Sequence, residues 1–531
     1  MSLLDIQNLT IRINGKPVVE GVSLSVAPGE ILAITGESGS GKSMTSFATM
    51  HLLPHGAALS GTIRLDGEDL TALSEPALCA RRGRDMGMVF QEPMTALNPV
   101  HSIGRQVAET IRIHTGASPA EARRQALATL ERVGLPPEKF PPERYPHELS
   151  GGQRQRVVIA LAIALRPKLL IADEPTTALD VTTQAQILKL LVRLTREDGM
   201  GMILITHDLA VVAQHADRIA VMQHGKVVET ARTQDLLHQM QHPYTKMLFK
   251  ASTHQVALPE IPPAEPLLVA ENLTRSYPVA RRHLFQERAR FIAVKDVSFS
   301  ILKGERVGLV GESGCGKSTL TRALLGLEPL QAGRITLAGA EVRADGKAML
   351  EARRRMQVVF QDPFGSFNPR HRVSRLITEP LHLLARQPTG AERTRAVAEA
   401  LEAVGLRAED ADRFIHEFSG GQRQRIAIAR ALILKPDLII FDEAVSALDV
   451  SVRAQILDLL AALCRSHGLT YLFISHDLTV VRSVTDRVLI MQAGEIVEQG
   501  ETESVFSNPQ HPYTRTLLAA APRMPVLNHQ V

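Results

Sequence analysis

The sequence predicts an α/β chain built from two tandem copies of one domain. Its 531 residues exceed the length of one ordinary core. Short β-rich runs alternate with helical ones, which is the pattern of a sheet flanked by helices. Landmark residues recur at a nearly constant separation: Lys42 and Lys317 are 275 residues apart, and Asp173 and Asp442 are 269 apart. Such a long repeat indicates a duplicated domain rather than short stacked repeats.

The expected domains cover residues 1–252 and 267–531, the second including a C-terminal tail. Residues 253–266 form a proline-rich linker, and its prolines favour an extended, semi-rigid spacer. We expect a helical subdomain between the two halves of each sheet, at about residues 105–133 and 372–416. The second copy also has an arginine-rich arm, 279–290, which is either a solvated loop or a contact for lipid headgroups or a partner.

Helix starts are recognisable within both subdomains. Ser118 is placed to cap a helix, and Glu121 has the spacing that completes a capping box. Thr389 and Glu392 repeat this spacing in the second copy. The sequence therefore predicts the same kind of helix start in both copies.

The composition is that of an ordinary globular protein, with 44% hydrophobic and 22% charged residues. A net charge of +4 neither demands nor excludes nucleic acid, although a pI near 9.0 fits weak attraction to an anionic membrane surface. Three widely spaced cysteines favour a reduced compartment. We find no secretion signal and no apolar run long enough to span a bilayer, so we expect any membrane role to be peripheral.

A glycine-rich loop follows an apolar run in each copy, at residues 36–43 and 311–318. Strand, loop and helix in that order form the context that a phosphate-binding loop requires. Backbone N–H groups of such a loop surround an anion, the lysine reaches the β- and γ-phosphates, and the serine hydroxyl binds Mg²⁺. A chance glycine turn is the alternative, but two copies in the same context exclude it. The candidate ATP-binding residues here are Gly36, Ser38, Gly39, Gly41, Lys42, Ser43, Met44, Gly311, Ser313, Gly314, Gly316, Lys317, Ser318 and Thr319.

Adjacent carboxylates end another apolar run in each copy, as Asp173-Glu174 and Asp442-Glu443. The aspartates would hold Mg²⁺, through water because Mg²⁺ keeps several waters. The glutamates would polarise the attacking water as general bases. An ordinary acidic strand end is the alternative, and the phosphate loop upstream in both copies argues against it.

A Ser-Gly-Gly-Gln motif precedes a helical run in each copy and forms either a second anion cradle or a helix cap. Phosphate loop, glutamine, Ser-Gly-Gly-Gln, acidic pair and histidine occur in the same order twice. The sequence therefore resembles the ATP-binding cassette (ABC) ATPases over nearly all of its length, with two cassettes on one chain. This resemblance implies two tandem ABC-type P-loop nucleotide-binding domains, each with a RecA-like α/β core and a helical subdomain.

The resemblance also implies residue roles. Cassettes of this family pair head to tail, so the loop of one copy and the Ser-Gly-Gly-Gln of the other enclose each ATP. The glutamines would sense Mg²⁺ and the attacking water, the histidines would contact the γ-phosphate, and Asp180 and Asp449 fit a loop that signals across the pair. The catalytic candidates are Glu174, Glu443, His207, His476, Gln91 and Gln361. The metal candidates are Ser43, Gln91, Asp173, Ser318, Gln361 and Asp442, and the motif's ATP contacts are Ser150, Gly152, Gln153, Ser419, Gly421 and Gln422.

An aromatic residue upstream of the phosphate loop stacks on adenine in this family. Tyr277 fits that role in the second copy, whereas the matching position of the first copy holds Ile13. We therefore expect weaker or differently supported adenine binding at the first site.

The two cassettes close with Gln-His-Pro-Tyr-Thr, at residues 241–245 and 510–514. This resembles the tail motif of the oligopeptide, dipeptide and nickel uptake ATPases, although a proline-started helix would also explain it. The resemblance implies an ATP- and Mg²⁺-dependent motor of an importer for peptides or related small solutes. It would be a peripheral protein at the cytoplasmic face of the inner membrane. Its partners would be two transmembrane permease subunits and, through them, an extracytoplasmic substrate-binding protein, and no nucleic acid is expected. The alternative is a soluble twin-cassette ATPase acting on ribosomes, a class that usually has a longer, charged helical linker.

Overall fold

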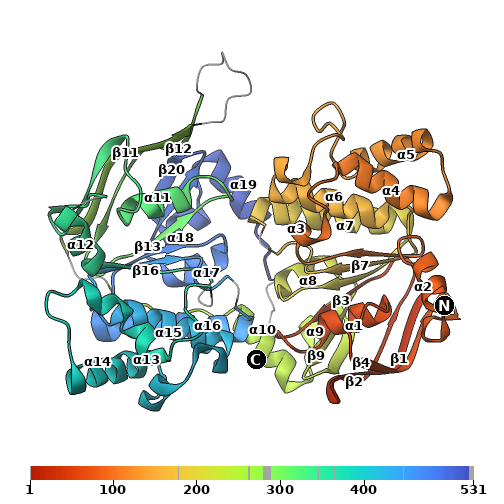
Figure 1. The fold of residues 1–531 in the computed structure, drawn as a ribbon, viewed down its shortest axis with the longest axis horizontal. Coiled ribbons are helices and arrows are strands. Elements are labelled where there is room, and N and C mark those ends of the chain that lie inside the picture. Colours follow the sequence, from red (N-terminus) through yellow and green to blue (C-terminus); the bar gives the residue numbers. More distant parts are fainter. Residues whose placement is uncertain are drawn as a thin grey trace. The chain divides into compact units, whose positions relative to one another are not determined.

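The computed structural model describes residues 2–177, 179–260, 264–278, 289–344, 346–362, 365–446 and 448–524. Most of the expected arginine-rich arm, residues 279–288, lies outside them. The chain divides into two compact units (Figure 1). Their main parts are Met1–Thr253 and His254–Leu448 with Val452–Ala521. The expected duplication is therefore present, while the limits of the linker stay a prediction.

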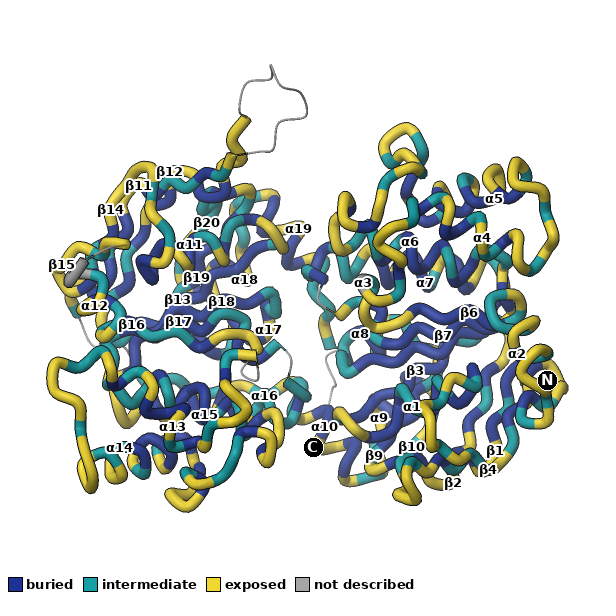
Figure 2. The backbone as a smooth tube through the Cα atoms, viewed as in Figure 1, coloured by how far each residue is buried: buried dark blue, intermediate teal, exposed yellow. Residues whose placement is uncertain are grey.

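A six-stranded sheet forms the centre of the first unit, in the order β10-β9-β3-β8-β7-β6. All its neighbouring strands run parallel except β10, which pairs antiparallel with β9. Figure 2 shows the middle of this sheet as buried, because both of its faces are covered. The strands are β3 (Ile31–Thr35), β6 (Met86–Val89), β7 (Leu169–Asp173), β8 (Gly201–Ile205), β9 (Arg218–Gln223) and β10 (Lys226–Arg232).

Successive residues of β7 contribute to two different cores. Leu170 and Ala172 pack with the long helices of the unit, whereas Leu169 and Ile171 pack with the antiparallel sheet β2-β1-β4-β5. This alternation follows from the two-residue period of a strand. The antiparallel strands are β1 (Leu4–Ile13), β2 (Lys16–Val26), β4 (Ala57–Leu65) and β5 (Glu68–Asp69). The helices are α1 (Lys42–Thr49), α2 (Glu75–Arg81), α3 (Pro93–Ala96), α4 (Ile103–Thr115), α5 (Pro119–Arg132), α6 (Gly151–Ile163), α7 (Val181–Asp198), α8 (Leu209–His215), α9 (Thr233–His238) and α10 (Pro243–Ser252).

The second unit repeats this plan, with the sheets β16-β17-β18-β13-β19-β20 and β12-β11-β14-β15. Its strands are β11 (Pro266–Pro278), β12 (Arg290–Leu302), β13 (Arg306–Val310), β14 (Ala332–Leu337), β15 (Ala340–Glu341), β16 (Met356–Val359), β17 (Leu438–Asp442), β18 (Tyr471–Ile474), β19 (Arg487–Gln492) and β20 (Glu495–Glu501). Its helices are α11 (Lys317–Leu324), α12 (Gly346–Arg355), α13 (Val373–Ile377), α14 (Gly390–Ala403), α15 (Gly420–Leu432), α16 (Val450–His467), α17 (Leu478–Val484), α18 (Thr502–Ser507) and α19 (Pro512–Ala520).

The helical subdomain is confirmed in both copies, but the predicted capping boxes are wrong in part. The Ser118 hydroxyl accepts a bond from the Glu121 N–H at 3.3 Å, while the Glu121 carboxylate is engaged by Arg124 instead of by the cap backbone. In the second copy the Thr389 hydroxyl caps nothing, because the Glu392 N–H donates to the Thr389 carbonyl at 3.1 Å. Spacing alone therefore predicted the helix starts but not their bonding.

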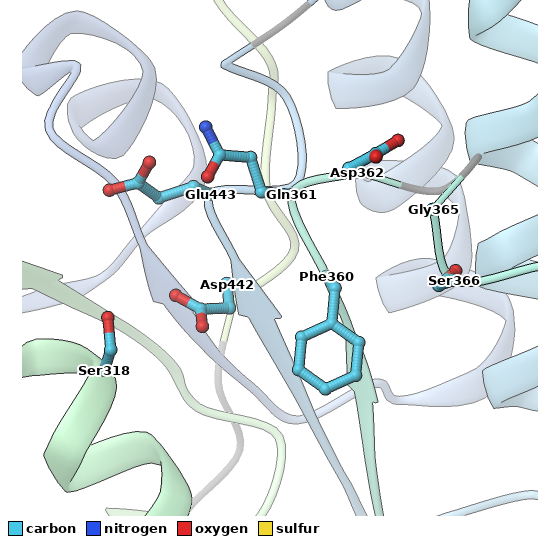
Figure 3. Close-up of a pocket in the computed structure, with 8 residues that line it drawn as sticks. All are labelled: Ser318, Phe360, Gln361, Asp362, Gly365, Ser366, Asp442 and Glu443. Carbon is cyan, nitrogen blue, oxygen red and sulfur yellow. The ribbon is translucent and has the colours of Figure 1, made fainter. Parts of the chain in front are cut away.

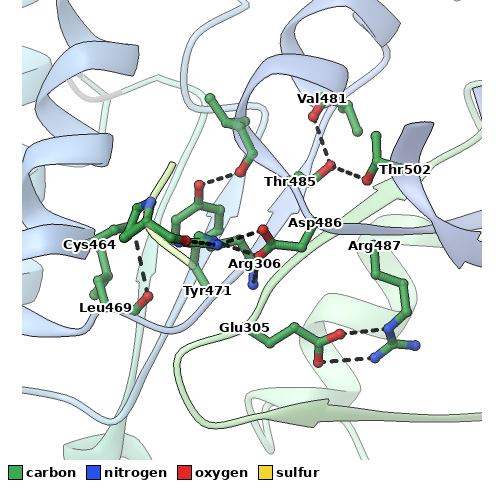
Figure 4. A network of polar contacts seen from close by, with 12 residues as sticks. Glu305, Arg306, Cys464, Leu469, Tyr471, Val481, Thr485, Asp486, Arg487 and Thr502 are labelled. Carbon is green, nitrogen blue, oxygen red and sulfur yellow. Dashed lines mark hydrogen bonds and ion pairs between the residues drawn. The ribbon is translucent and has the colours of Figure 1, made fainter. Parts of the chain in front are cut away.

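The linker is bound to the second unit along its described part. Arg465 donates a hydrogen bond to the Ala257 carbonyl at 2.9 Å, and Arg306 donates to the Pro259 carbonyl at 2.6 Å. Arg306 also donates to the Asp486 carboxylate at 2.6 Å. Figure 4 shows this pair. The linker is therefore anchored at two carbonyls rather than free along its whole length.

Candidate nucleotide-binding sites

The glycine-rich loop of the first copy leaves the carboxyl end of β3 and ends in α1. Gly36 must be glycine, because a Cβ there would lie 2.1 Å from the Met222 carbonyl oxygen. Lys42 curls back so that its ammonium donates to the carbonyls of Gly36 and Glu37, both at 2.8 Å. Burial lowers the pKa of Lys42. Burial removes water from the Lys42 ammonium, and the loop backbone encloses it. A negatively charged phosphate chain bound there would compensate the ammonium for the lost solvation.

The second copy builds the same loop between β13 and α11. Lys317 donates to the Gly311 and Glu312 carbonyls at 2.7 and 2.9 Å, and a Cβ on Gly311 would lie 2.2 Å from the Met491 carbonyl oxygen. The remaining candidates take matching places in both copies. Gly41 and Gly316 have positive φ and directly precede the helices. The exposed residues at the loop tips are Ser38, Gly39, Ser313 and Gly314. Met44 and Thr319 lie half-buried in the first helical turns.

Two of the three predicted metal residues of the first copy, Ser43 and Asp173, meet at the end of β7. The Ser43 hydroxyl donates to the Asp173 carboxylate at 3.1 Å. Asp173 is only 3% exposed, and burial raises its pKa to about 6. A buried carboxylate beside a serine hydroxyl provides the oxygen ligands that Mg²⁺ prefers, and a cation there would offset the cost of burying the charge. These residues therefore fit the metal.

The second copy presents its predicted metal residues around an open pocket of about 540 Å³. In Figure 3 the Asp442 carboxylate points toward Ser318, and the side chains of Gln361 and Glu443 lie next to each other beyond Asp442. Burial, followed by the charge of Glu443, raises the pKa of Asp442 above its usual value. The pocket thus collects all three predicted metal ligands of the second copy and the predicted base.

Glu174 stands at the centre of a small polar group. Its carboxylate accepts a hydrogen bond from the Gln91 amide at 2.8 Å and from the Thr177 hydroxyl at 3.0 Å, and it lies 3.3 Å from Nδ1 of His207. Burial is the largest influence and raises the pKa of Glu174, but His207, Thr177 and Lys42 together outweigh it, so the pKa is lowered. Glu174 is therefore ionised at neutral pH, as a general base requires.

The backbone also fixes both glutamates. Glu174 has a φ of 45° and Glu443 a φ of 52°, in the left-handed region that non-glycine residues rarely adopt. Their N–H groups donate to the Ile205 and Ile474 carbonyls at 2.9 Å, which holds them just past the strand ends.

The second site differs in one contact. His476 lies 3.5 Å from the Glu443 carboxylate and is the main cause of that group's lowered pKa. The Gln361 amide, however, donates to the Ser446 hydroxyl at 3.4 Å rather than to Glu443. The acid–histidine pair is therefore common to both copies, while the glutamine partner differs.

Each Ser-Gly-Gly-Gln motif starts a helix. Ser150 and Gln153 form a reciprocal capping box, with Gln153 N–H to Ser150 hydroxyl at 3.4 Å and Ser150 N–H to Gln153 side chain at 3.0 Å. Ser419 and Gln422 repeat both distances. A Cβ on Gly152 would lie 2.3 Å from Thr183, and one on Gly421 would lie 2.3 Å from Val452. The helix-cap interpretation is thus confirmed, and the ATP-contact role stays a prediction.

Tyr277 occupies the position that corresponds to Ile13. Tyr277 of β11 pairs with Phe291 of β12, just as Ile13 of β1 pairs with Lys16 of β2 in the matching strands of the first copy. The Tyr277 hydroxyl bonds to Glu328, and the Arg275 guanidinium lies 4.7 Å from the ring centroid. One face of the ring is therefore covered by arginine, and adenine stacking stays a prediction. Asp180 caps α7 by accepting from the Thr183 N–H at 2.9 Å, and Asp449 directly precedes α16.

Two tyrosines of the tails escaped the sequence prediction as site residues. The hydroxyls of Tyr244 and Tyr513 each accept a hydrogen bond from a phosphate-loop N–H, that of Glu37 or Glu312, at 3.0 Å. The one available signal was the repetition of the same tyrosine in both tails.

The fold and the duplicated loop, acid and histidine arrangement define a tandem P-loop ATPase. The family model "ABC transporter" matches residues 19–177 and 294–446, and "Oligopeptide/dipeptide transporter, C-terminal region" matches 228–269 and 497–530. The chain belongs to the ABC transporter family. It is an ATP-hydrolysing subunit of an ABC importer for peptides or related small solutes. The family matches and the relatives thus favour the importer interpretation over the ribosomal one.

Curated relatives match along nearly the whole chain. The Escherichia coli O157:H7 "Glutathione import ATP-binding protein GsiA" is 48% identical, over 95% of this chain and 86% of that one. The Agrobacterium fabrum "Peptidoglycan transport ATP-binding protein YejF" is 46% identical, over 98% of this chain and 96% of that one. A solved structure, "Dimeric Structure of MJ0796, a Bacterial ABC Transporter Cassette", is 32% identical, with a TM-score of 0.39, over 43% of this chain and 98% of that one. Within the described part of this chain, no helix is long and apolar enough to cross a membrane.

Proposed function

We propose that both cassettes hydrolyse ATP and that they drive import through two transmembrane permease subunits. The observation that carries this proposal is the repeated pairing of a strand-end glutamate with a histidine, at 3.3 Å for Glu174 and 3.5 Å for Glu443. Because both pairs are intact and both glutamates have a lowered pKa, neither site has lost its base.

Each residue of the first site has a defined task in this proposal. Lys42 neutralises the β- and γ-phosphates, and Glu174 accepts the proton of the attacking water. Gln91 contacts one oxygen of the Glu174 carboxylate and His207 the other, which fixes the orientation of this carboxylate. Ser43, Asp173 and Gln91 would hold Mg²⁺, which supplies charge neutralisation at the phosphate oxygens.

The second site uses the equivalent residues, and each site is completed by the opposite cassette. Ser419, Gly421 and Gln422 would contact the ATP held by the first loop, and Ser150, Gly152 and Gln153 the ATP held by the second. A helix N-terminus carries a partial positive charge, which attracts the negative phosphates.

Membership of the family supports the partners that we propose. The chain would bind peripherally at the cytoplasmic face of the inner membrane, and an extracytoplasmic binding protein would deliver the cargo to the permeases. Small peptides or related solutes are the cargo class that the tail region and the relatives' names support.

Hydrolysis by the purified chain with its permeases, reconstituted in vesicles, tests the two-site proposal. Replacing one base at a time, Glu174→Gln or Glu443→Gln, should lower kcat, and the double variant should lower it by at least about 100-fold. ATP binding should persist in all three variants, because the amide keeps the size of the carboxylate. If one single variant kept the full wild-type rate, that cassette would not be a hydrolysing site.

A further inference from the structure

The tail of each cassette contacts the phosphate loop of the same cassette. The Tyr244 hydroxyl accepts a hydrogen bond from the Glu37 N–H at 3.0 Å, and the Tyr513 hydroxyl accepts one from the Glu312 N–H at 3.0 Å. The partners are 207 and 201 residues apart in sequence, and both tyrosines are buried, at 5% and 8% exposed. The same contact thus occurs once in each copy.

The tyrosine is held in place by the rest of its motif. The Glu229 carboxylate of β10 accepts hydrogen bonds from the N–H groups of Gln241 and His242, at 2.7 and 3.1 Å. The His242 ring then accepts a bond from the Tyr244 N–H at 3.2 Å, and Pro243 begins helix α10. In the second copy Glu498, Gln510, His511 and Tyr513 make the same bonds at 2.7, 3.1 and 3.3 Å. The three motif residues that precede the tyrosine therefore help to aim its hydroxyl at the loop.

The loop residue that the tyrosine contacts is restrained from both sides. The Glu37 N–H is bound to Tyr244, and the Glu37 carbonyl accepts a bond from Lys42 at 2.8 Å. The orientation of these peptide groups decides whether the following N–H groups face a phosphate. A loop already held in that orientation loses less conformational entropy when the phosphates bind.

We propose that Tyr244 and Tyr513 are positioning residues that keep the phosphate loops of their own cassettes in the ATP-binding conformation. The proposal rests on the proposed assignment of these loops to the ATP phosphates. The oligopeptide-type tail is then a structural part of each nucleotide site. Without the hydroxyl, the loop N–H turns to water and the loop samples other conformations. The apparent ATP affinity falls in proportion to the fraction of molecules that remain in the binding conformation.

Tyr244→Phe and Tyr513→Phe remove only the hydroxyls, and Tyr471→Phe is the matched control. Tyr471 is also buried, and its hydroxyl donates to the Val484 carbonyl. It lies beside Arg306 (Figure 4), at the start of β13, whereas the phosphate loop follows the other end of that strand. Hydrogen exchange of the loop amides and equilibrium ATP binding are measured on the full-length chain.

The Tyr244→Phe, Tyr513→Phe double variant should exchange its loop amides about tenfold faster and bind ATP about five- to tenfold more weakly. Its kcat at saturating ATP should stay within twofold, because bound ATP restores the loop. Tyr471→Phe should lower the Tm without either loop effect. Loop exchange and affinity within twofold of wild type would overturn the proposal, as would equal effects from Tyr471→Phe. Lys42→Ala with Lys317→Ala tests the loop assignment separately: if ATP binding survives in that variant, it is the assignment of the loops that fails.

Discussion

The two glycines of the second Ser-Gly-Gly-Gln motif differ sharply in their surroundings. An added Cβ would meet nothing within 4 Å at Gly420, but at Gly421 it would lie 2.3 Å from Cγ1 of Val452. Val452 cannot easily move aside, because it is β-branched and lies in the first turn of α16. Gly421→Ala must therefore displace the start of α16, whereas Gly420→Ala should not.

Gly421→Ala should have a lower free energy of unfolding than Gly420→Ala because it overpacks the site, which costs about 1–3 kcal/mol. Both glycines lie in the first turn of α15, so the helix-propensity gain of alanine is similar at both positions and cancels. At about 3 °C per kcal/mol, the second unit of Gly421→Ala should melt about 6 °C below that of Gly420→Ala. Differential scanning calorimetry of the two full-length variants measures this gap. Equal melting of the two variants would refute the close approach of α15 and α16.

Two further predictions concern a buried acid and the linker. A raised pKa means that the folded state binds the Asp173 proton more tightly than the unfolded state, so the ionised carboxylate costs stability above pH 6 and nothing below about pH 4. Nucleotide-free Asp173→Asn should therefore gain stability over wild type between pH 4 and 7, by about 3 kcal/mol at most, and a pH-independent difference in Tm would contradict this. Arg465→Ala should speed proteolysis within residues 254–260 several-fold, because the Ala257 carbonyl loses its donor. Its counterpart Arg196→Ala, in the first copy, should leave that cleavage rate unchanged.

The parts of the site that the sequence predicted are those carried by short segments. The phosphate loop, the acid at the end of β7 and the histidine after β8 follow buried apolar runs, so their positions at one sheet edge result from parallel pairing. The pairing of Glu174 with His207 then follows, since both strands end side by side.

Contacts between distant segments were beyond the sequence. Nothing local to Tyr244 indicates that its hydroxyl reaches a loop 207 residues earlier. The linker anchor depends on Arg306, whose counterpart in the first copy is Ile31. The role of this one difference becomes clear only from the positions of Asp486 and Pro259 beside Arg306 in the structure.

The most direct test of the central claim is affinity purification of the Glu174→Gln, Glu443→Gln double variant with ATP from detergent-solubilised cells. The account predicts that two multi-span membrane proteins are recovered in stoichiometric amounts, and that they are lost when Lys42→Ala and Lys317→Ala are added. Recovery of ribosomal proteins without permeases would contradict it.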